Sequence, residues 1–457
     1  MVEVPPTNRE DQTVPDHALA TLREVLSTYR LTFGRRGFAK FLVFAVGWIL
    51  TQGPTHCVTE ALIATDVARR CHWAAYHRFF SRGTWDPDRL GFWLLQRLRS
   101  GLAAGVLQLV IDDTLCPKKG PEVFGLGTHI DAVRSTKKHK VFCFGHCWVV
   151  LAVLVRVPFS TRTWALPLLF RLYRSKADAG ADYQKKTELA RQMLEVVLAW
   201  TEADRCMLHV ALDQGYANAT VLRGLSERVV AVAAMRPNAA LTDLPDPSQG
   251  PRRKKGDRRP SPAQVAQDAT SPWQYVSAHL YGVTETVAFK TFVAQWYRVT
   301  GPNLVRVVVV RCSRGTVPYR VFFSTEPTWT VAKLLEAYAA RWAIEVFFRD
   351  AKQLFGLADS PAWSEQAVRH VAPLVGLLLS TLVVWFVDVF DSPVAALPIR
   401  PWYAQKKDLC FADVLRAARR TLEGVDVLAW ESTKAHSSSE TPPPPEAPGF
   451  DPPALAA

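Results

Sequence analysis

The 457-residue sequence predicts an α/β fold, in which a helical N-terminal region leads into a sheet covered by helices. Two observations carry this prediction. From residue 106 onward, short β-branched runs alternate with amphipathic patterns in the order three strands, helix, strand, helix, strand. In addition, 49% of the residues are hydrophobic and 21% are charged, which is typical of a globular chain long enough for two or three domains.

The N-terminal part has helical periodicity and contains a basic, aromatic stretch, VARRCHWAAYHRFFSRGTW. Its arginines and histidines suit phosphate contacts, and they equally suit the solvated face of an ordinary helical pair. After the alternating segment, a loop rich in proline, glycine and charge precedes four strand-like runs, and the chain ends in a proline-rich tail. The expected organisation is therefore a flexible N-terminus (1–16), a helical N-terminal domain that we expect to bind DNA (17–104), an α/β core (105–235 and 326–395), a β-rich insertion (236–325), a C-terminal helical segment (396–431) and a disordered tail (432–457).

Charge and targeting signals narrow the class of protein. The formal net charge is +13, which favours a polyanionic partner such as nucleic acid or an anionic membrane surface. The eight cysteines form no CxxC pair, and no apolar signal-like run opens the chain, so we expect a reducing, cytoplasmic location. Residues 370–387 lack Asp, Glu, Lys and Arg and approach a membrane-spanning length. We interpret them as a buried helix, because they stand alone and follow an amphipathic helix.

The stretch YAARWAIEVFFRDAK, residues 338–352, has a narrow polar row on an otherwise apolar helix. At about 100° per residue, the polar side chains fall within roughly 40° of one another. A solvated helix face is usually broad and mixed in charge, whereas here one carboxylate lies among cations between apolar flanks. The pattern indicates a functional strip that faces a cleft, made of Tyr338, Arg341, Glu345, Arg349 and Lys352.

Two strand-like runs end in aspartates that are candidate partners for Glu345. LVIDDT ends in Asp112 and Asp113, and HVALDQGY contains Asp213. In α/β sheets functional groups gather beyond the carboxyl ends of strands, although capping and turn roles are equally open for each aspartate alone. Two aspartates and a glutamate are hard oxygen ligands suited to two Mg²⁺ ions, which Mn²⁺ can replace, and such a pair supports phosphoryl transfer. The cations Arg341, Arg349 and Lys352, with Tyr338, would then contact DNA phosphates or sugars.

These three motifs resemble those of bacterial insertion-sequence transposases of the DDE class. The helix matches their Tyr-x2-Arg-x3-Glu-x6-Lys pattern, VIDDTLCPKKG resembles their first-aspartate motif, and LDQGYAN resembles their second. The resemblance, from about residue 20 to 420, implies an RNase H-like core with a β-rich insertion before the glutamate. It also implies a catalytic, metal-binding triad of Asp113, Asp213 and Glu345, with Asp113 preferred to Asp112 because it precedes the threonine. Gln214 and Gly215 stand where the family often has an arginine soon after the aspartate.

The resemblance predicts a metal-dependent enzyme that cleaves DNA at the ends of its own element and transfers the 3′ hydroxyl into target DNA. Its partners would be double-stranded terminal inverted repeats, target DNA and a second copy of the chain, with no membrane. Trp296 in the insertion is a candidate for stacking on a base or, alternatively, a core residue. Two other classes stay open, a catalytically silent transposase-derived DNA-binding regulator and a membrane protein built around residues 370–387. The intact carboxylates argue against the first, and the isolation of the apolar segment argues against the second.

Overall fold

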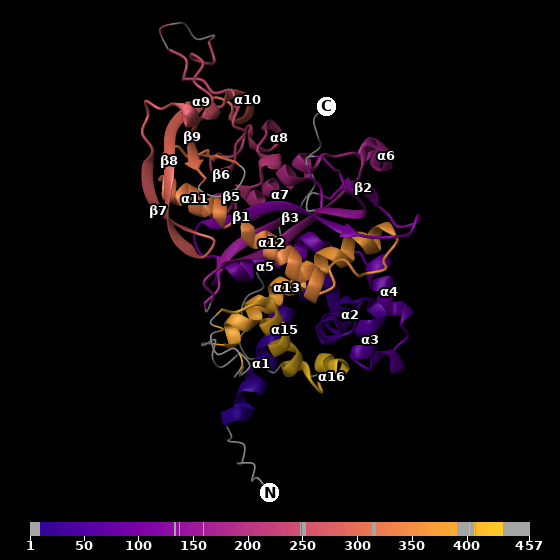
Figure 1. Cartoon of the computed structure of the whole chain (residues 1–457). Coiled ribbons are helices and arrows are strands. Elements are labelled where there is room, and N and C mark those ends of the chain that lie inside the picture. The colour runs from indigo at the N-terminus through magenta and orange to yellow at the C-terminus, as the bar shows by residue number, and fades with distance from the viewer. Residues whose placement is uncertain are drawn as a thin grey trace.

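The computed structural model describes residues 10–131, 134–136, 138–158, 160–246, 248, 253–312, 317–390, 402, 406 and 408–432. The expectations for the first nine residues, for the proline-rich tail from 433 and for most of 391–407 lie outside these ranges. The remaining chain forms the helices and strands drawn in Figure 1.

Within the described residues, ten strands form one mixed sheet. They are β1 (Leu107–Pro117), β2 (Gly127–Ile130), β3 (Phe142–Arg156), β4 (Thr163–Tyr173), β5 (Leu208–Leu212), β6 (Val229–Ala234), β7 (Gln274–Leu280), β8 (Val283–Gln295), β9 (Leu304–Arg311) and β10 (Tyr319–Ser324). The order is β2-β3-β1-β5-β6-β10-β9-β8-β7, and β4 also pairs with β3. At its centre β4, β3 and β1 are antiparallel, whereas β1, β5 and β6 are parallel. This mixed sheet with its helices confirms the predicted α/β class with an RNase H-like core.

The strands expected in the insertion continue the same sheet. β10 pairs antiparallel with β6, and β9, β8 and β7 follow outward as antiparallel neighbours. Figure 1 shows them at the upper left, on the far side of the core from the N-terminal helices. The insertion therefore lengthens the core sheet and does not form a sheet of its own.

The N-terminal region is helical, as predicted, with α1 (Glu10–Ser27), α2 (Arg30–Leu50), α3 (Val58–Ala64), α4 (Ala74–Ser81) and α5 (Pro87–Arg99). The start of α5 follows from its sequence, because the Asp86 side chain accepts from the Asp88 amide and Pro87 occupies the first turn. Its buried leucine and aromatic positions pack on β4. These helices share one continuous hydrophobic core with the sheet.

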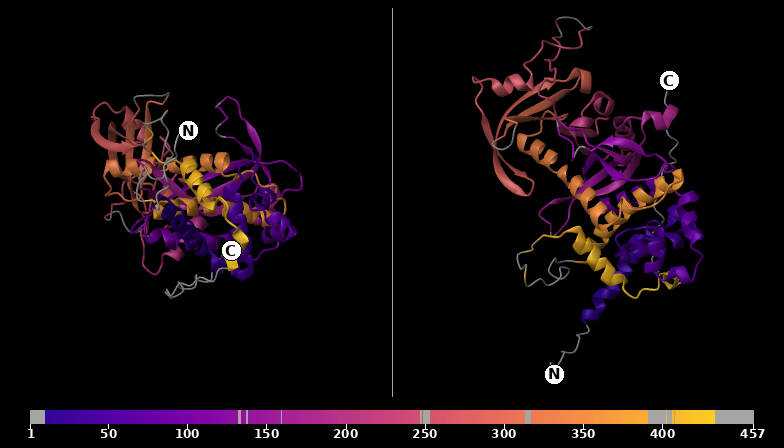
Figure 2. Two further views of the ribbon diagram at one scale, coloured as in Figure 1. Left: turned by 90° about the horizontal axis from the view of Figure 1, so that it is seen from below. Right: turned by 45° about the vertical axis from the view of Figure 1, so that its right-hand side comes forward.

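The other helices lie among and after the strands. They are α6 (Lys176–Ala179), α7 (Lys186–Trp200), α8 (Ala219–Leu222), α9 (Pro262–Gln267), α10 (Tyr297–Thr300), α11 (Val331–Ala339), α12 (Trp342–Leu354), α13 (Glu365–Val389), α15 (Phe411–Leu422) and α16 (Val427–Ser432). The right-hand view of Figure 2 shows α11, α12 and α13 in orange between the strands and the indigo N-terminal helices. Helices α12 and α13 pack on β4, and α7 packs on β3 and β4.

The apolar segment 370–387 lies inside α13. This helix is long and apolar enough to cross a membrane, yet 94% of its most apolar window is buried inside the protein. Its neighbours are β4, α1 and α5. The imidazole of His370 contacts the carbonyl of Phe80 at 2.9 Å and stacks on Trp85 with ring centroids 4.0 Å apart. The prediction that the segment forms a buried helix is confirmed.

Candidate active site

Two parallel strands place aspartates in matching positions. β1 and β5 pair as far as Ile111 beside Leu212, and the next residue after each is Asp112 and Asp213. Residues opposite each other in a parallel register point to the same face of the sheet. β5 ends at Leu212, whereas β1 continues along β3 to Pro117, so the prediction that a strand ends at Asp112 and Asp113 is wrong. The register therefore brings Asp112 and Asp213 to one face.

Arg341, which precedes α12, connects this face to Glu345. One guanidinium nitrogen, Nη1, lies 2.5 Å from Asp112 Oδ2 and 3.5 Å from Glu345 Oε1. The side chains of Arg341 and Asp112 are only 13% and 14% exposed, whereas that of Glu345 is 42% exposed. Burial opposes the charge of Arg341, but the nearby carboxylates of Asp112, Asp213 and Glu345 raise its pKa above the ordinary value. The three acidic residues thus share one electrostatic environment.

The carboxyl group of Asp112 has a raised pKa. Burial raises its pKa to about 7, against the opposing effects of Arg341 and of the Asp113 amide, while the charges of Asp113 and Glu345 raise it further. A nearby positive charge would lower this pKa and favour the ionised carboxylate. In addition, Arg341 Nε is buried without a hydrogen-bond partner among the described residues.

Asp113 points to the other face of the sheet, because neighbouring residues on a strand alternate. Its carboxylate accepts from the Tyr216 hydroxyl at 2.8 Å on Oδ1 and from Lys186 Nζ at 2.6 Å on Oδ2. The Cys147 thiol lies 3.5 Å from Oδ2. Lys186 is the first residue of α7, whereas Arg341 directly precedes α12, so the two adjacent aspartates face different helices.

The expected straight helix is divided in two. Tyr338 lies on α11, and α12 begins at Trp342. Between them the Arg341 amide bonds to the carbonyl of Tyr338 and the Ile344 amide bonds to the carbonyl of Arg341, spacings of three residues that tighten the backbone. The polar row keeps the contact between Arg341 and Glu345, and the Tyr338 ring instead packs on Phe322, with centroids 4.6 Å apart.

The two remaining cations of the row have different surroundings. Lys352 Nζ donates to the carbonyl of Leu115 at 2.8 Å, which attaches α12 to β1 near Asp112. The Arg349 side chain is 52% exposed and pairs with Asp350. Arg349 is therefore available to a ligand at the surface, whereas Lys352 also holds the site together.

Trp296 does not offer a free ring to a base. It is only 9% exposed and packs edge-on against Phe323, with centroids 5.1 Å apart. The base-stacking prediction for Trp296 is corrected on this ground, and the alternative interpretation as a core tryptophan is the one that the structure has.

Two side chains of this region were not predicted from the sequence. Tyr216 lies within the quoted LDQGYAN motif, but nothing in its spacing indicates that its hydroxyl reaches Asp113. Lys186 lies 73 residues from Asp113 along the chain. Only the packing of α7 against the sheet brings that cation to Asp113.

The donor set suits a hard divalent cation. No group of three or more His, Cys, Asp or Glu side chains is close enough to hold a metal ion within the described part of the chain. Where β1 and β5 cease to pair, however, oxygen atoms of Asp112 and Glu345 already converge on one cationic group, the Arg341 guanidinium, and Asp213 lies in register beside Asp112. Carboxylate oxygens are the ligands that Mg²⁺ and Mn²⁺ prefer. The residues present therefore fit such an ion.

Comparisons with known proteins identify the family of the chain. A family described as DDE superfamily endonuclease matches residues 32–300. No curated protein is significantly similar in sequence. Among solved structures, the chain is similar to a piggyBac transposase in a synaptic complex with hairpin DNA, at 10% identity and a TM-score of 0.43, over 93% of this chain and 83% of that one. That structural likeness is too low to support a function, whereas the family match covers more than half of the chain. The chain belongs to the DDE superfamily endonuclease family.

Proposed function

We propose that this protein is a DNA transposase of a bacterial insertion sequence. It cleaves DNA at the ends of its element and joins the freed 3′ hydroxyl to a target strand. The observation that carries the proposal is the register of β1 and β5, which sets Asp112 beside Asp213, together with the contacts of Arg341 with Asp112 and Glu345. The net charge of +13 supports a polyanionic substrate.

Endonucleases of this family depend on divalent metal ions. We propose two Mg²⁺ ions, replaceable by Mn²⁺, held by Asp112, Asp213 and Glu345. Such ions activate the attacking oxygen and stabilise the leaving oxygen in phosphoryl transfer. The assignment of Asp113, which the sequence motif favours, stays a prediction. We prefer Asp112 because it faces Arg341 and Glu345, whereas the Asp113 carboxylate already has Lys186 and Tyr216 as donors.

The cations around these carboxylates position DNA in this proposal. Arg341 reaches two carboxylates with one nitrogen and keeps Nε without a partner among the described residues, so its guanidinium can donate to a phosphate oxygen beside them. The exposed Arg349 adds a second phosphate contact on the same helix. Tyr338, whose ring packs at a tilt against Phe322, orients Arg341 through its ring, with the guanidinium carbon 5.8 Å from the ring centroid.

Substitution of the carboxylates tests the proposal. The substrate is a DNA duplex that carries the inverted repeats flanking the gene. Asp112→Asn, Asp213→Asn and Glu345→Gln keep side-chain size and remove one charge each. We expect cleavage in Mg²⁺ to fall about a thousandfold or more, with partial recovery in Mn²⁺ and with DNA binding retained. Glu365→Gln, an exposed carboxylate on α13 paired with Arg369, is the matched control.

Two outcomes would contradict the proposal or its residues. Near wild-type cleavage by Glu345→Gln in Mg²⁺ would show that the polar row is a packing feature. Full activity of Asp112→Asn with loss in Asp113→Asn would return the first ligand to Asp113. The catalytically silent regulator is less favoured, because all three carboxylates are present; it predicts that wild-type protein binds the repeats and never cuts them.

The remaining assignments are part of the same proposal. The protein would act on double-stranded DNA as a homodimer, one copy at each element end, in the cytoplasm beside the nucleoid. The basic residues of the N-terminal helices supply a second DNA contact. Arg69 is exposed and pairs only locally with Asp66 among the described residues, while Arg70 is tied to Asp426. Arg69 is therefore the better candidate for a phosphate contact.

A further inference from the structure

We infer that Asp113 is a positioning residue, which, with Lys186 and Tyr216, holds the turn that carries Asp213 in place. The inference rests on the proposed function and gives a positioning role to three side chains that are not ligands in the proposed metal site. Asp213 and Tyr216 are the ends of a tight turn in which the Tyr216 amide bonds to the Asp213 carbonyl at 3.0 Å.

Local hydrogen bonds shape this turn. The Gly215 amide donates to Asp213 Oδ2 at 3.4 Å, and the Asn218 side chain donates to the carbonyl of Gly215 at 3.0 Å. These bonds link residues within the turn and give it an internal shape. They do not locate it relative to β1.

Tyr216 provides the link to β1. The residue is 4% exposed, and its hydroxyl donates to Asp113 Oδ1 at 2.8 Å. Asp113 is adjacent on the strand to Asp112, which belongs to the proposed metal site. Beyond the β1–β5 pairing, which ends at Ile111 and Leu212, this hydrogen bond is therefore a further link between the turn of Asp213 and the strand of Asp112.

Both oxygens of the Asp113 carboxylate accept from side-chain donors. Lys186 Nζ lies 2.6 Å from Oδ2, and the Cys147 thiol lies 3.5 Å from the same atom. Burial and, next, the charge of Asp113 raise the pKa of Cys147 to about 12 against the opposing charge of Lys186, so the thiol keeps its proton as a donor. With Lys186 as counter-ion, the negative charge of Asp113 is balanced on its own face of the sheet. Both oxygens of Asp112 are also engaged, by the Asp113 amide and by Arg341, so the two residues differ in the face of the sheet on which their partners lie.

Tyr216→Phe is the sharpest test, because it removes one oxygen atom and keeps the buried ring. Tyr275→Phe, on a tyrosine that is 69% exposed, is the matched control. The first measurement is hydrogen exchange of the backbone amides of residues 214–218 in the free protein. We expect exchange there to become about tenfold faster in Tyr216→Phe, the factor that one hydrogen bond corresponds to, with no change in the control. Asp113→Asn should show the same local effect.

The second measurement is the concentration of Mg²⁺ at half-maximal cleavage, together with a Tb³⁺ luminescence titration of the free protein. Tyr216→Phe should raise the required concentration of both ions several-fold and leave repeat-DNA affinity unchanged. A merely structural role would lower the melting temperature without moving the metal requirement. Asp112→Asn should weaken Tb³⁺ binding without accelerating exchange in the turn.

Unchanged exchange and an unchanged metal requirement in Tyr216→Phe would overturn the inference. So would an Asp113→Asn variant that loses Tb³⁺ binding as completely as Asp112→Asn, because Asp113 would then be a ligand. If the proposed function itself is wrong, Asp112→Asn and Asp213→Asn would both cleave DNA normally, which distinguishes that failure from failure of the inference. The exchange measurement needs no cleavage and still decides whether Asp113 and Tyr216 hold the turn.

Discussion

Two adjacent aspartates on β1 acquire different chemistry from one property of a strand, the alternation of side chains between faces. Asp112 meets the buried guanidinium of Arg341 and has its pKa raised to about 7, chiefly by burial. Asp113 meets Lys186 and Tyr216 on the opposite face. The motif IDDT is compatible with either residue as the ligand, because a short sequence motif does not report which face packs against which helix.

Two cations of α12 also differ in their surroundings, since Arg349 is exposed whereas Lys352 donates to a carbonyl of β1. This difference predicts different roles in DNA binding and stability. Arg349→Gln should weaken binding to repeat DNA about evenly across sequences and reduce its salt slope by about 1, with no loss of melting temperature. Lys352→Met should also lower the melting temperature, because it leaves the Leu115 carbonyl without its donor. Salt titrations of binding and thermal melts measure both effects. Equal melting losses in the two variants would contradict the assignment.

His209 gives a prediction for pH dependence. Burial, with Lys333 nearby, lowers its pKa from 6.5 to about 4, and Glu326 opposes the shift. Its ring packs edge-on against Trp329, and Nδ1 lies 3.0 Å from Gln108 Nε2. Between these two pKa values the unfolded chain binds the proton and the folded chain does not. The contribution of neutral His209 is therefore complete above pH 6.5 and is lost as the pH falls toward 4.

We expect the free energy of unfolding of the wild type to fall by about 2 kcal/mol over this range from this residue, after allowance for partial exposure. His209→Gln should flatten that part of the profile, as measured by denaturant unfolding at pH 7.5 and 4.5. His72→Gln, at an exposed position, is the control. A wild-type slope retained in His209→Gln would assign the pH dependence to other groups.

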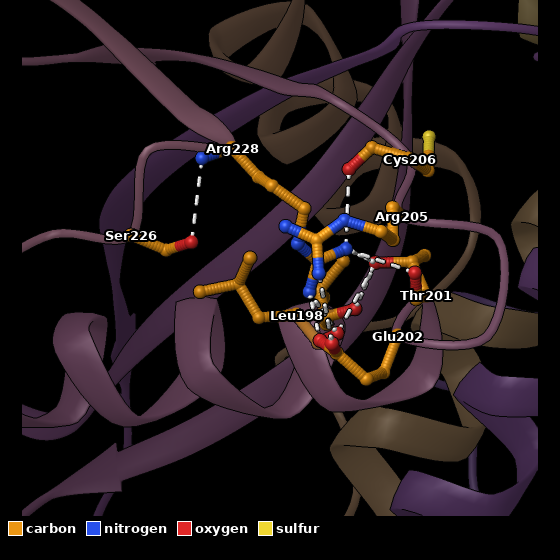
Figure 3. Close-up of polar contacts among 8 residues, drawn as sticks. Leu198, Thr201, Glu202, Arg205, Cys206, Ser226 and Arg228 are labelled. Carbon is orange, nitrogen blue, oxygen red and sulfur yellow. Dashed lines mark hydrogen bonds and ion pairs between the residues drawn. The ribbon is translucent and has the colours of Figure 1, made fainter.

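At the scale of the element, α7 depends on a residue that lies outside it. The last carbonyls of a helix have no donors within the helix. Arg228, which is 6% exposed, donates to the carbonyl of Leu198 at 2.9 Å and to that of Thr201 at 2.8 Å, and it pairs with Glu202 (Figure 3). A cation at this end also interacts favourably with the helix dipole. Since Lys186 is the first residue of α7, the position of that helix bears on the network around Asp113.

Arg228→Met should lower the free energy of unfolding by about 2–4 kcal/mol, because buried carbonyls would lose their donors. The neighbouring Arg205 is a matched control, since its side chain is 76% exposed and its contact with Glu202 is 3.9 Å long. Arg205→Gln should change stability by no more than about 0.5 kcal/mol. Denaturant unfolding curves compare the two, and similar losses would mean that the contacts of Arg228 contribute little.

At the scale of the whole molecule, the N-terminal helices and the sheet form one packed unit. The N-terminal helices share one core with the sheet, and α13 lies within it, while a second, smaller cluster lies between the sheet and α11. The Trp385 indole donates to the carbonyl of Ala18 at 2.9 Å, and the hydroxyls of Tyr29 and Thr381 lie 2.6 Å apart. Together these contacts attach α1 to α13 and explain why so apolar a helix is covered within the protein.

A substitution at Gly91 tests whether the N-terminal helices and the sheet unfold together, because Gly91 lies where α5 packs against β4. A Cβ atom at this position would lie 2.2 Å from the backbone oxygen of Leu168. Gly91→Ala should therefore lower stability by about 2–3 kcal/mol, through displacement of the helix from the sheet. Gly101→Ala is the control, because a Cβ there meets nothing within 4 Å. Calorimetry should show one transition shifted downward in Gly91→Ala, whereas two separate transitions would mean that residues 17–104 fold independently.

The sequence by itself determined the α/β class, the helical start, the strands of the insertion and the identity of Asp213, Arg341 and Glu345 as neighbours of one site. It could do so because periodicity and strand-end aspartates are local patterns that report local structure. The tertiary structure alone decided that Asp112 faces Arg341, that Trp296 is buried and that Lys186 and Tyr216 reach Asp113. These depend on which helix covers which face of the sheet. That choice is made by contacts between residues far apart in the chain, which no local pattern records.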